Sequence, residues 1–314
     1  MSLAFLFPGQ GSQAVGMGAA LAEAFPSARL VFEEVDDALG QKLFALMREG
    51  PEGDLTLTEN TQPALMAVSL AVVRALKVEF GVDVTAASFV AGHSLGEYSA
   101  LAAADALGLA DTARLLKLRG QAMQRAVPVG EGAMASLIGP KADVALAEAA
   151  AQAGSAFGVC VVANDNNAGN VVISGAKAAM DRAIEKAKEL GARAIPLNVS
   201  APFHSPLMAP AAEEMREALA GAAILAPRAP LVTNVTARPT LDPEQIRALL
   251  VEQITGRVRW RESVIWLAEE GGITRFAELG AGKVLTGMAK RIAPDAEAVA
   301  LNTPEDLEAF AKSL

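Results

Sequence analysis

The sequence predicts an α/β protein in which a mostly parallel, helix-covered sheet is interrupted by a small inserted unit. Short apolar runs alternate with helix-forming stretches in both outer parts of the chain, an order typical of parallel sheets. The segment 127–198 instead follows a β-α-β-β-α-β order, which is that of a ferredoxin-like subdomain. We therefore predict a large domain formed by 1–126 and 199–314, and a small subdomain formed by 127–198.

The first outer part, 1–126, is expected to begin with a buried strand and to continue mainly as helices. In chain order, its predicted elements are a strand over 3–7, a glycine-rich turn over 8–13, helices over 15–49 and 63–80, a strand over 87–91 and a helix over 111–126. Pro63 is expected to start its helix, because a proline at the first helical position loses no hydrogen bond. Asp111 or Thr112 suits the cap of the last of these helices.

The rest of the chain divides into the inserted subdomain and a second alternating part. The predicted elements of the subdomain are strands over 133–138, 157–163, 170–174 and 193–197, with helices over 141–153 and 176–190. After it we predict a segment over 202–220 that begins as a loop and becomes helical, strands over 231–235 and 275–279, helices over 243–253 and 261–270, and a short terminal helix.

Composition narrows the class of protein. With 314 residues, 52% of them hydrophobic, the chain can bury a large core. A net charge of −9 argues against a nucleic-acid binder, which needs a basic face. The single cysteine, Cys160, cannot form an internal disulfide and is expected to be a small buried hydrophobe. We expect no signal peptide, and we interpret the apolar stretch 64–76, which Arg74 interrupts, as a core helix that is too short to span a membrane.

The most specific chemical signal is the serine in Gly92–Gly96, which matches G-x-S-x-G. Such a serine lies on a sharp strand-to-helix turn, and the apolar run before it and the helix formers after it favour that turn here. The glycines allow a tight reversal and leave room beside the serine oxygen. We predict that Ser94 is a nucleophile; the alternative is a structural turn serine.

A serine nucleophile needs a base, and the chain has only 2 histidines, His93 and His204. His93 is adjacent to Ser94, so its side chain leaves the backbone in a different direction, and a supporting role suits it better. His204 lies in a proline-flanked loop, and by elimination we predict it as the base. The group that orients His204 stays open, because Asp165 has the chain order of a hydrolase triad but a carbonyl can also orient an imidazole.

Arg119 is the next candidate, because all residues three and four positions away from it on the predicted helix are apolar. An arginine on an apolar face is costly unless an anion pairs with it. A more specific interpretation is that the Arg119 guanidinium binds a substrate carboxylate through two hydrogen bonds. An internal salt bridge or a snorkelling side chain is the alternative.

Two glycine-rich turns match nucleotide-binding loops only in part. The turn Gly9–Ala14 fits G-x-G-x-x-A, but Pro8 interrupts the strand-to-glycine junction and the expected acidic strand end is missing. Its backbone amides suit an oxyanion hole better, together with the amide of Leu95. The turn Gly280–Lys283 lacks the spacing of a phosphate loop. The sequence therefore predicts no cofactor, and it shows no cysteine and histidine cluster that could hold a metal.

Six motifs stand in one order along the chain: Phe7–Gln13, Gly92–Glu97, Arg119, Ala201–His204, Val251–Gln253 and Glu278–Gly280. In this combination the chain resembles malonyl-CoA:acyl carrier protein transacylases of the bacterial fatty acid synthesis type over essentially its whole length. The resemblance implies an α/β-hydrolase-like large domain, a ferredoxin-like small subdomain, a monomer, a cytoplasmic location and no cofactor.

The resemblance also implies a role for each matching residue. Ser94 would be the acylated nucleophile and His204 its base, while Arg119 would hold the free malonyl carboxylate. The backbone amides of Gln10 and Leu95 would form the oxyanion hole.

Two further positions take their meaning from the resemblance alone. The backbone carbonyl of Gln253 would orient the histidine, which would replace Asp165 in that role. The phenylalanine before the base, Phe203, resembles that of malonyl-selective members. One departure concerns the small subdomain, where the family commonly has N-x-x-x-P-G-Q-V; here Asn164 is followed by 168–171, which lacks the proline and the glutamine.

The reaction implied is a ping-pong transfer of the malonyl group from malonyl-CoA to the phosphopantetheine thiol of acyl carrier protein. Neither a nucleic acid nor a membrane is expected as a partner. An ordinary serine esterase and a non-catalytic carrier-binding module are the alternatives. Because carrier and chain are both expected to be acidic, docking would need a local basic patch. The candidates for it are Lys117, Arg257, Arg259, Lys290 and Arg291.

Overall fold

A parallel sheet forms the centre of the larger part of the molecule. The computed structural model describes residues 2–199 and 201–314. In spatial order, the strands of this sheet are β10 (Glu297–Leu301), β9 (Arg275–Leu279), β1 (Leu3–Phe7), β2 (Phe89–Gly92), β7 (Leu231–Val232) and β8 (Pro239–Thr240). All neighbours pair in parallel except β7 and β8, which are antiparallel. The mostly parallel sheet predicted from the sequence is confirmed.

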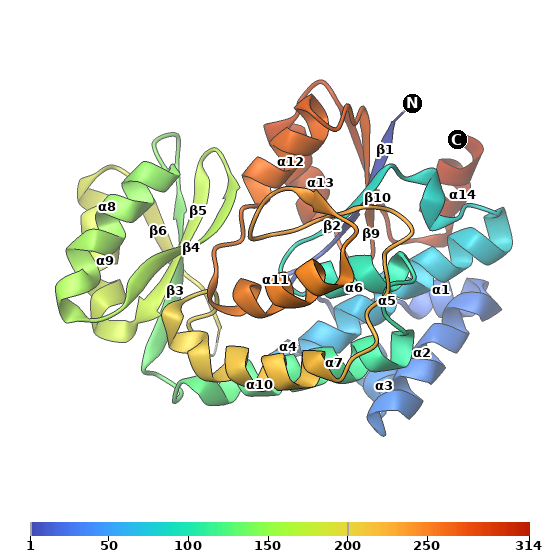
Figure 1. The fold of residues 1–314 in the computed structure, drawn as a ribbon, viewed down its shortest axis with the longest axis horizontal. Coiled ribbons are helices and arrows are strands. Elements are labelled where there is room, and N and C mark those ends of the chain that lie inside the picture. Colours follow the sequence, from blue (N-terminus) through green and yellow to red (C-terminus); the bar gives the residue numbers. More distant parts are fainter. Residues whose placement is uncertain (1, 200) are drawn as a thin grey trace.

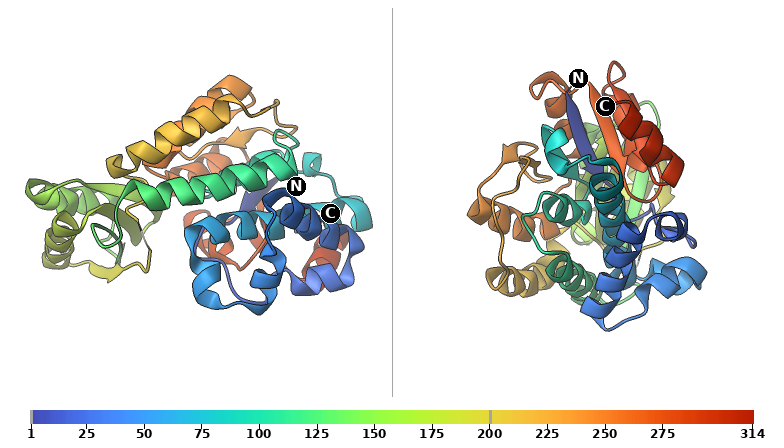
Figure 2. Two further views of the ribbon diagram at one scale, coloured as in Figure 1. Left: turned by 90° about the horizontal axis from the view of Figure 1, so that it is seen from below. Right: turned by 90° about the vertical axis from the view of Figure 1, so that its right-hand side faces the viewer.

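Helices cover both faces of this sheet, as Figures 1 and 2 show. Those before the small subdomain are α1 (Ala19–Ala24), α2 (Pro26–Leu39), α3 (Leu43–Glu49), α4 (Glu52–Thr56), α5 (Thr58–Phe80), α6 (Gly96–Ala103) and α7 (Leu109–Ala126). Those after it are α10 (Ala209–Ala220), α11 (Pro243–Thr255), α12 (Trp260–Glu269), α13 (Val284–Ile292) and α14 (Pro304–Lys312). Because side chains alternate along a strand, β1 contributes Phe5 to one core with α5 and α7, and Leu6 to another with α12 and α13.

A separate antiparallel sheet lies at one end of the molecule, remote from both chain termini (Figure 1). Its strands, in spatial order, are β4 (Cys160–Asn167), β5 (Asn170–Ala176), β3 (Gly132–Ile138) and β6 (Arg193–Pro196). The helices α8 (Val144–Gly154) and α9 (Lys177–Glu189) pack on it through small apolar residues. The chain order is therefore the predicted β-α-β-β-α-β, with both β-α-β halves interleaved in one sheet. The domain boundaries at 126/127 and 198/199 stay predictions.

Backbone hydrogen bonds join β4 of the small sheet to the segment between α11 and α12. The amide of Asp165 on β4 donates to the carbonyl of Val258, and the amide of Val258 donates to Ala163. The parallel bridge between Asn164 and Val258 belongs to the same connection. The stretch of β4 from Ala163 to Asp165 therefore lies against the larger part of the molecule.

Several predicted element ends are wrong, and tertiary packing is the reason. Pro63 lies inside α5, which begins at Thr58 because the turn before the proline is buried and held by side-chain bonds, such as Thr61 to the Leu55 carbonyl. The helix α7 begins two residues before Asp111, and Gly108 caps it without a side-chain bond. The stretch 15–49, predicted to be helical, contains three separate helices, α1, α2 and α3.

Two elements near the end of the chain, α13 and β10, were not predicted at all. The first turn of α13 receives its capping acceptor from Glu278, a buried residue on β9, so no local capping signal marks its start. The apolar stretch 64–76 lies in α5, in the protein core. In the part of the chain that the structure describes, no helix combines the length and apolarity needed to cross a membrane.

Candidate active site

The predicted serine turn connects β2 to α6. Ser94 adopts a left-handed backbone with φ 53°, a strained conformation for a residue with a side chain. The flanking glycines are required sterically: a Cβ on Gly92 would lie 1.9 Å from the backbone of Gly96, and one on Gly96 would lie 2.2 Å from the Phe7 carbonyl oxygen. The turn is held further by Asn234, whose Oδ1 accepts from the Ser94 amide at 2.7 Å. The serine oxygen is thereby presented at the carboxyl end of β2.

His204 contacts the serine directly. Its Nε2 lies 2.8 Å from Ser94 Oγ, and its Nδ1 lies 2.9 Å from the backbone oxygen of Gln253. Because a carbonyl only accepts, Nδ1 carries the proton and Nε2 is left to accept from the serine hydroxyl. Asp165, the alternative orienting group, instead pairs with Arg261, whose Nε lies 3.0 Å from both carboxylate oxygens and whose Nη2 lies 2.9 Å from Oδ2. The hydrolase-type triad through Asp165 is therefore absent, because its carboxylate is held by the larger part of the molecule elsewhere.

The surroundings of His204 keep its imidazole neutral. Burial, aided by the positive charge of Arg119, lowers the pKa of His204 to about 3. A neutral imidazole with its free lone pair facing a hydroxyl is the form in which histidine accepts a proton.

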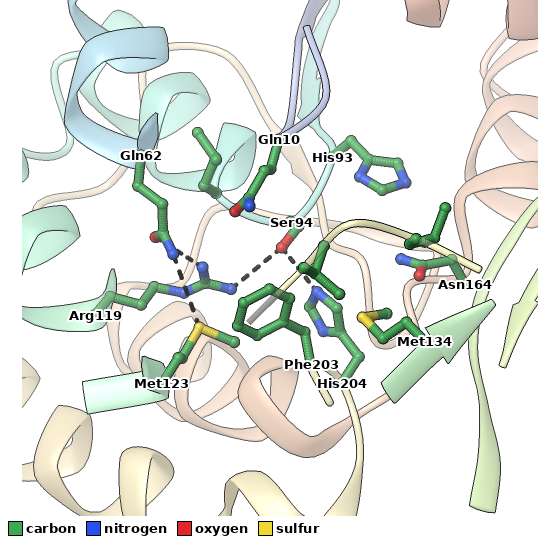
Figure 3. A pocket seen from close by; sticks show the side chains of 13 residues that line it. Gln10, Gln62, His93, Ser94, Arg119, Met123, Met134, Asn164, Phe203 and His204 are labelled. Carbon is green, nitrogen blue, oxygen red and sulfur yellow. Dashed lines mark hydrogen bonds between the residues drawn. The ribbon is translucent and has the colours of Figure 1, made fainter. Parts of the chain in front are cut away.

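His93 points away from the serine hydroxyl, as Figure 3 shows. Its Nε2 lies 2.9 Å from Asn166 Oδ1 on β4, and its ring packs against Trp260 with centroids 5.6 Å apart. Burial lowers the pKa of His93. The histidine inside the motif therefore links the serine turn to the small sheet, in agreement with the supporting role expected for it.

Arg119 points from α7 into the same site and is only 1% exposed. Its Nη2 donates to Ser94 Oγ at 3.2 Å and to Gln253 Oε1 at 2.8 Å, and its Nη1 donates to Gln62 Oε1 at 2.8 Å. Within residues 2–199 and 201–314, no carboxylate lies within 4.0 Å of the guanidinium. Neither the internal salt bridge nor the snorkelling side chain is found; the partners of this buried cation are neutral, namely the amide side chains of Gln62 and Gln253, the Ser94 hydroxyl and the Tyr98 ring, whose centroid lies 5.7 Å from Cζ.

Two backbone amides beside the serine are without a partner in the described part of the chain: those of Gln10 and Leu95. Gln10 follows the end of β1, and Leu95 follows the nucleophile. The side chain of Gln10 donates a hydrogen bond from Nε2 to Thr58 Oγ1 at 3.3 Å. Unpaired amides at the ends of two adjacent parallel strands suit an oxyanion that develops at Ser94.

These groups surround a cavity of about 110 Å³ (Figure 3). Its polar wall contains Gln10, Gln62, Ser94, Arg119 and His204, and its apolar wall contains Met123, Met134, Leu197, Val199 and Phe203. A larger hollow of about 660 Å³ shares Gln10 and Val199 with it. The small chamber has room for a short acyl group, and the hollow beside it for a longer substituent.

Sequence reasoning assigned no role to three polar residues of the site, Gln62, Asn234 and Glu97. Glu97 ends the motif Gly92–Glu97 and Gln62 precedes Pro63, but burial of their side chains is visible only in the fold. Asn234 lies within the predicted strand 231–235, but the structure has only the two-residue β7 there, so Asn234 lies beyond the strand end.

The other sequence candidates lie away from this cavity or carry no free charge. Burial raises the pKa of the Cys160 thiol to about 11, which suits an inert packed residue. Of the proposed basic patch, three members are paired with acids: Lys117 with Glu59, Arg257 with Glu148 and Arg259 with Glu262. Among the described residues, no three potential metal ligands gather in one place.

Comparison with known proteins places this geometry in a family. Residues 4–300 match the acyl transferase domain. Malonyl CoA-acyl carrier protein transacylase of Bacillus subtilis is 44% identical over 313 residues, covering 99% of this chain and 97% of the relative. The Escherichia coli K12 protein of that name is 44% identical over 307 residues, covering 98% and 97%.

Solved structures agree with this placement. An acyl-carrier-protein-S-malonyltransferase from Bartonella henselae superposes with a TM-score of 0.97 at 53% identity, covering 100% of this chain and 99% of that one. A malonyl-transacylase in complex with its type II PKS acyl-carrier protein superposes at 0.96 with 42% identity, covering 100% of both chains. With its fold and its full length matched, the chain belongs to the malonyl CoA-acyl carrier protein transacylases of the acyl transferase domain family, and it is an acyltransferase.

Proposed function

We propose that this chain transfers the malonyl group from malonyl-CoA to the phosphopantetheine thiol of acyl carrier protein through a malonyl ester on Ser94. The observation that carries the proposal is the position of one oxygen: Ser94 Oγ lies 2.8 Å from His204 Nε2 and 3.2 Å from Arg119 Nη2. The nucleophile is thus in contact both with a base, His204, and with a cation, Arg119, that can bind the carboxylate of the acyl group.

In the first half-reaction, His204 accepts the hydroxyl proton while Ser94 Oγ attacks the thioester carbonyl carbon. The oxyanion that forms is stabilised by the amides of Gln10 and Leu95. The carbon–sulfur bond then breaks, and the leaving thiolate of coenzyme A takes the proton from His204. In the second half-reaction, the carrier thiol attacks the ester and Ser94 regains its proton. Because a thioester is exchanged for an ester and back, no cofactor is required.

Arg119 is the proposed selectivity group. A malonyl ester on Ser94 would place a carboxylate beside the guanidinium, which has only neutral partners in the described part of the site. An acetyl ester would leave that charge without an anion. The 110 Å³ chamber, closed on one side by Phe203, suits the unbranched malonyl group.

An α/β-hydrolase-like arrangement of the larger part fits this mechanism. Nucleophile and oxyanion amides come from the carboxyl ends of β1 and β2, where open parallel sheets bind their ligands. A cytoplasmic location and a monomeric state stay predictions.

Intact-mass measurement after exposure to malonyl-CoA tests the proposal. We expect a mass gain of one malonyl group that is absent in Ser94→Ala. If no gain appears in the wild type, transfer through a malonyl ester on Ser94 is excluded. If the gain appears but free malonate is released rapidly without carrier protein, the chain is a serine esterase.

For the carrier, the solved relative in complex with its acyl-carrier protein supports a carrier protein as the partner of this chain. Of the predicted basic patch, Lys290 and Arg291 at the end of α13 are the exposed pair without an acidic partner among the described ion pairs. We expect the KM for carrier protein to rise with salt and in the double variant Lys290→Glu, Arg291→Glu. A KM that is insensitive to both would contradict docking at this pair.

A further inference from the structure

Glu97 is a buried carboxyl group beneath the nucleophile that the mechanism above does not use. It is the second residue of α6 and is 1% exposed. Its Oε2 accepts from Gln253 Nε2 at 2.7 Å and from the backbone amide of Asn234 at 3.2 Å. Both donors belong to residues that contact Ser94. A carboxyl group is costly to bury, so its place here calls for an explanation.

The contacts of Gln253 supply that explanation. Its Nε2 donates both to Glu97 and to the Ser94 carbonyl at 2.9 Å, and its Oε1 accepts from Arg119 Nη2 at 2.8 Å. An amide side chain has a donating end and an accepting end, and rotation by 180° exchanges them. Arginine can only donate, so Gln253 serves Arg119 in one orientation only. Two acceptors on the opposite side select that orientation, and Glu97 is the one supplied by a side chain.

We propose that Glu97 is a positioning residue that holds the Arg119 guanidinium in place through the Gln253 amide. The inference rests on the proposed role of Arg119 in receiving the malonyl carboxylate. Without the acceptor at position 97, Nε2 of Gln253 keeps only the Ser94 carbonyl as partner, so the preference of the amide for the orientation that accepts from Arg119 is weakened. The guanidinium is then held less firmly by one of its two amide partners.

The role requires an acceptor atom and not a charge. Burial raises the pKa of Glu97 to about 7, so both its forms are accessible near neutral pH. Each form has an oxygen that can accept from Gln253 and Asn234. A glutamine at this position can place its Oε1 where Glu97 Oε2 lies, whereas a methionine of similar size cannot.

The test compares Glu97→Met with Glu97→Gln, and it reads the ratio of serine acylation rates with malonyl-CoA and acetyl-CoA. We expect Glu97→Met to reduce this ratio about tenfold, because a hydrogen bond to a charged group is disturbed, and Glu97→Gln to leave it near the wild-type value. Glu278→Met is the matched control: Glu278 is also a buried carboxyl, 1% exposed, but it caps α13 through Leu285 and Thr286.

A purely structural role predicts a different result. In that case Glu97→Met would lower the Tm, as Glu278→Met does, and would leave the ratio unchanged, which overturns the proposal. An equal loss of the ratio in Glu97→Gln would overturn it too, because the charge would then be what matters.

A crystal structure of Glu97→Met separates this inference from the proposed function. We expect the contact of 2.8 Å between Arg119 Nη2 and Gln253 Oε1 to be lost. If Arg119→Ala leaves the malonyl to acetyl ratio unchanged, the substrate role of Arg119 fails, but the structure still tests the effect of Glu97 on Arg119. An unchanged Arg119 contact in Glu97→Met overturns the inference by itself.

Discussion

Arg119 donates a hydrogen bond to the oxygen of Ser94, with Nη2 and Oγ 3.2 Å apart. The same oxygen lies 2.8 Å from His204 Nε2, so one hydroxyl accepts from a buried cation and donates to a neutral base. This contact places the cation at the point where an acyl group would be attached. An acyl chain on Ser94 therefore lies within reach of Arg119 without any rearrangement of α7.

Replacing Arg119 tests whether this contact selects the acyl group. We expect Arg119→Ala to slow acylation by malonyl-CoA about a hundredfold, because the carboxylate loses a charged two-point partner, and to slow acylation by acetyl-CoA less. Rapid-quench acylation rates with both thioesters measure this. Arg119→Lys should be intermediate, since it keeps the charge but loses the planar fork. Equal slowing with both thioesters would exclude a role in selection.

Asn234 is predicted to stabilise the strained serine turn. Its Oδ1 accepts from the Ser94 amide at 2.7 Å, and its Nδ2 donates to the Gly92 carbonyl at 2.6 Å. Asn234→Ala leaves both buried groups unpaired, and we expect a loss of about 2 kcal/mol in the free energy of unfolding together with slower acylation. Asn234→Asp keeps the acceptor for Ser94 and loses only the donor, so it should acylate faster than Asn234→Ala. Urea unfolding and acylation rates measure the two effects.

The glycines of the serine turn are predicted to be irreplaceable. A Cβ on Gly96 would lie 2.2 Å from the backbone oxygen of Phe7, and backbone cannot move aside as a side chain can. We expect Gly96→Ala to lower the free energy of unfolding by at least about 3 kcal/mol.

Gly287 provides the matched control. It lies in α13, where an added Cβ would meet nothing within 4 Å. Gly287→Ala should raise the free energy of unfolding by about 0.5 kcal/mol, since alanine restricts the unfolded chain and favours helix. Urea unfolding compares the two variants. Similar values for both would contradict the steric argument.

The pH dependence of acylation follows from the neutral His204. Because burial, with Arg119 beside it, lowers the pKa of His204 to about 3, the base stays unprotonated in mildly acidic solution. We expect the rate of Ser94 acylation to show no decrease centred near 6.5, the usual pKa of histidine, between pH 8 and about 5. Single-turnover acylation across this range measures it. A midpoint near 6.5 would show that the imidazole titrates as if exposed.

The same shift predicts a trend in stability. The folded pKa of His204 lies below the unfolded value of 6.5, so the unfolded chain binds more protons between pH about 3 and 6.5. The contribution of His204 to the free energy of unfolding is therefore complete above pH 6.5 and is lost as the pH falls toward 3. His204→Gln cannot titrate, and its stability should fall less than that of the wild type over this window. Urea unfolding at several pH values compares them, and parallel curves would contradict the shift.

The mostly parallel α/β class, the β-α-β-β-α-β order of the small sheet and the short list of reactive residues could all be predicted from the sequence. Local patterns were sufficient for these. Strand, glycine turn and helix are neighbours in the chain around Ser94, and with only 2 histidines the base followed by elimination. Arg119 was recognised because its apolar neighbours on one helix face leave an arginine with an unexplained charge.

The contacts that hold these residues in place depend on the tertiary fold. His204 is separated from Gln253 by 49 residues and Arg119 from Gln253 by 134, and neither contact leaves a periodic signal in the chain. Chain order left Asp165 open as the orienting group until its pairing with Arg261 removed it. The role of the Glu97 carboxyl group could not be predicted for the same reason, since its burial and the direction of its hydrogen bonds depend on which distant segments pack together.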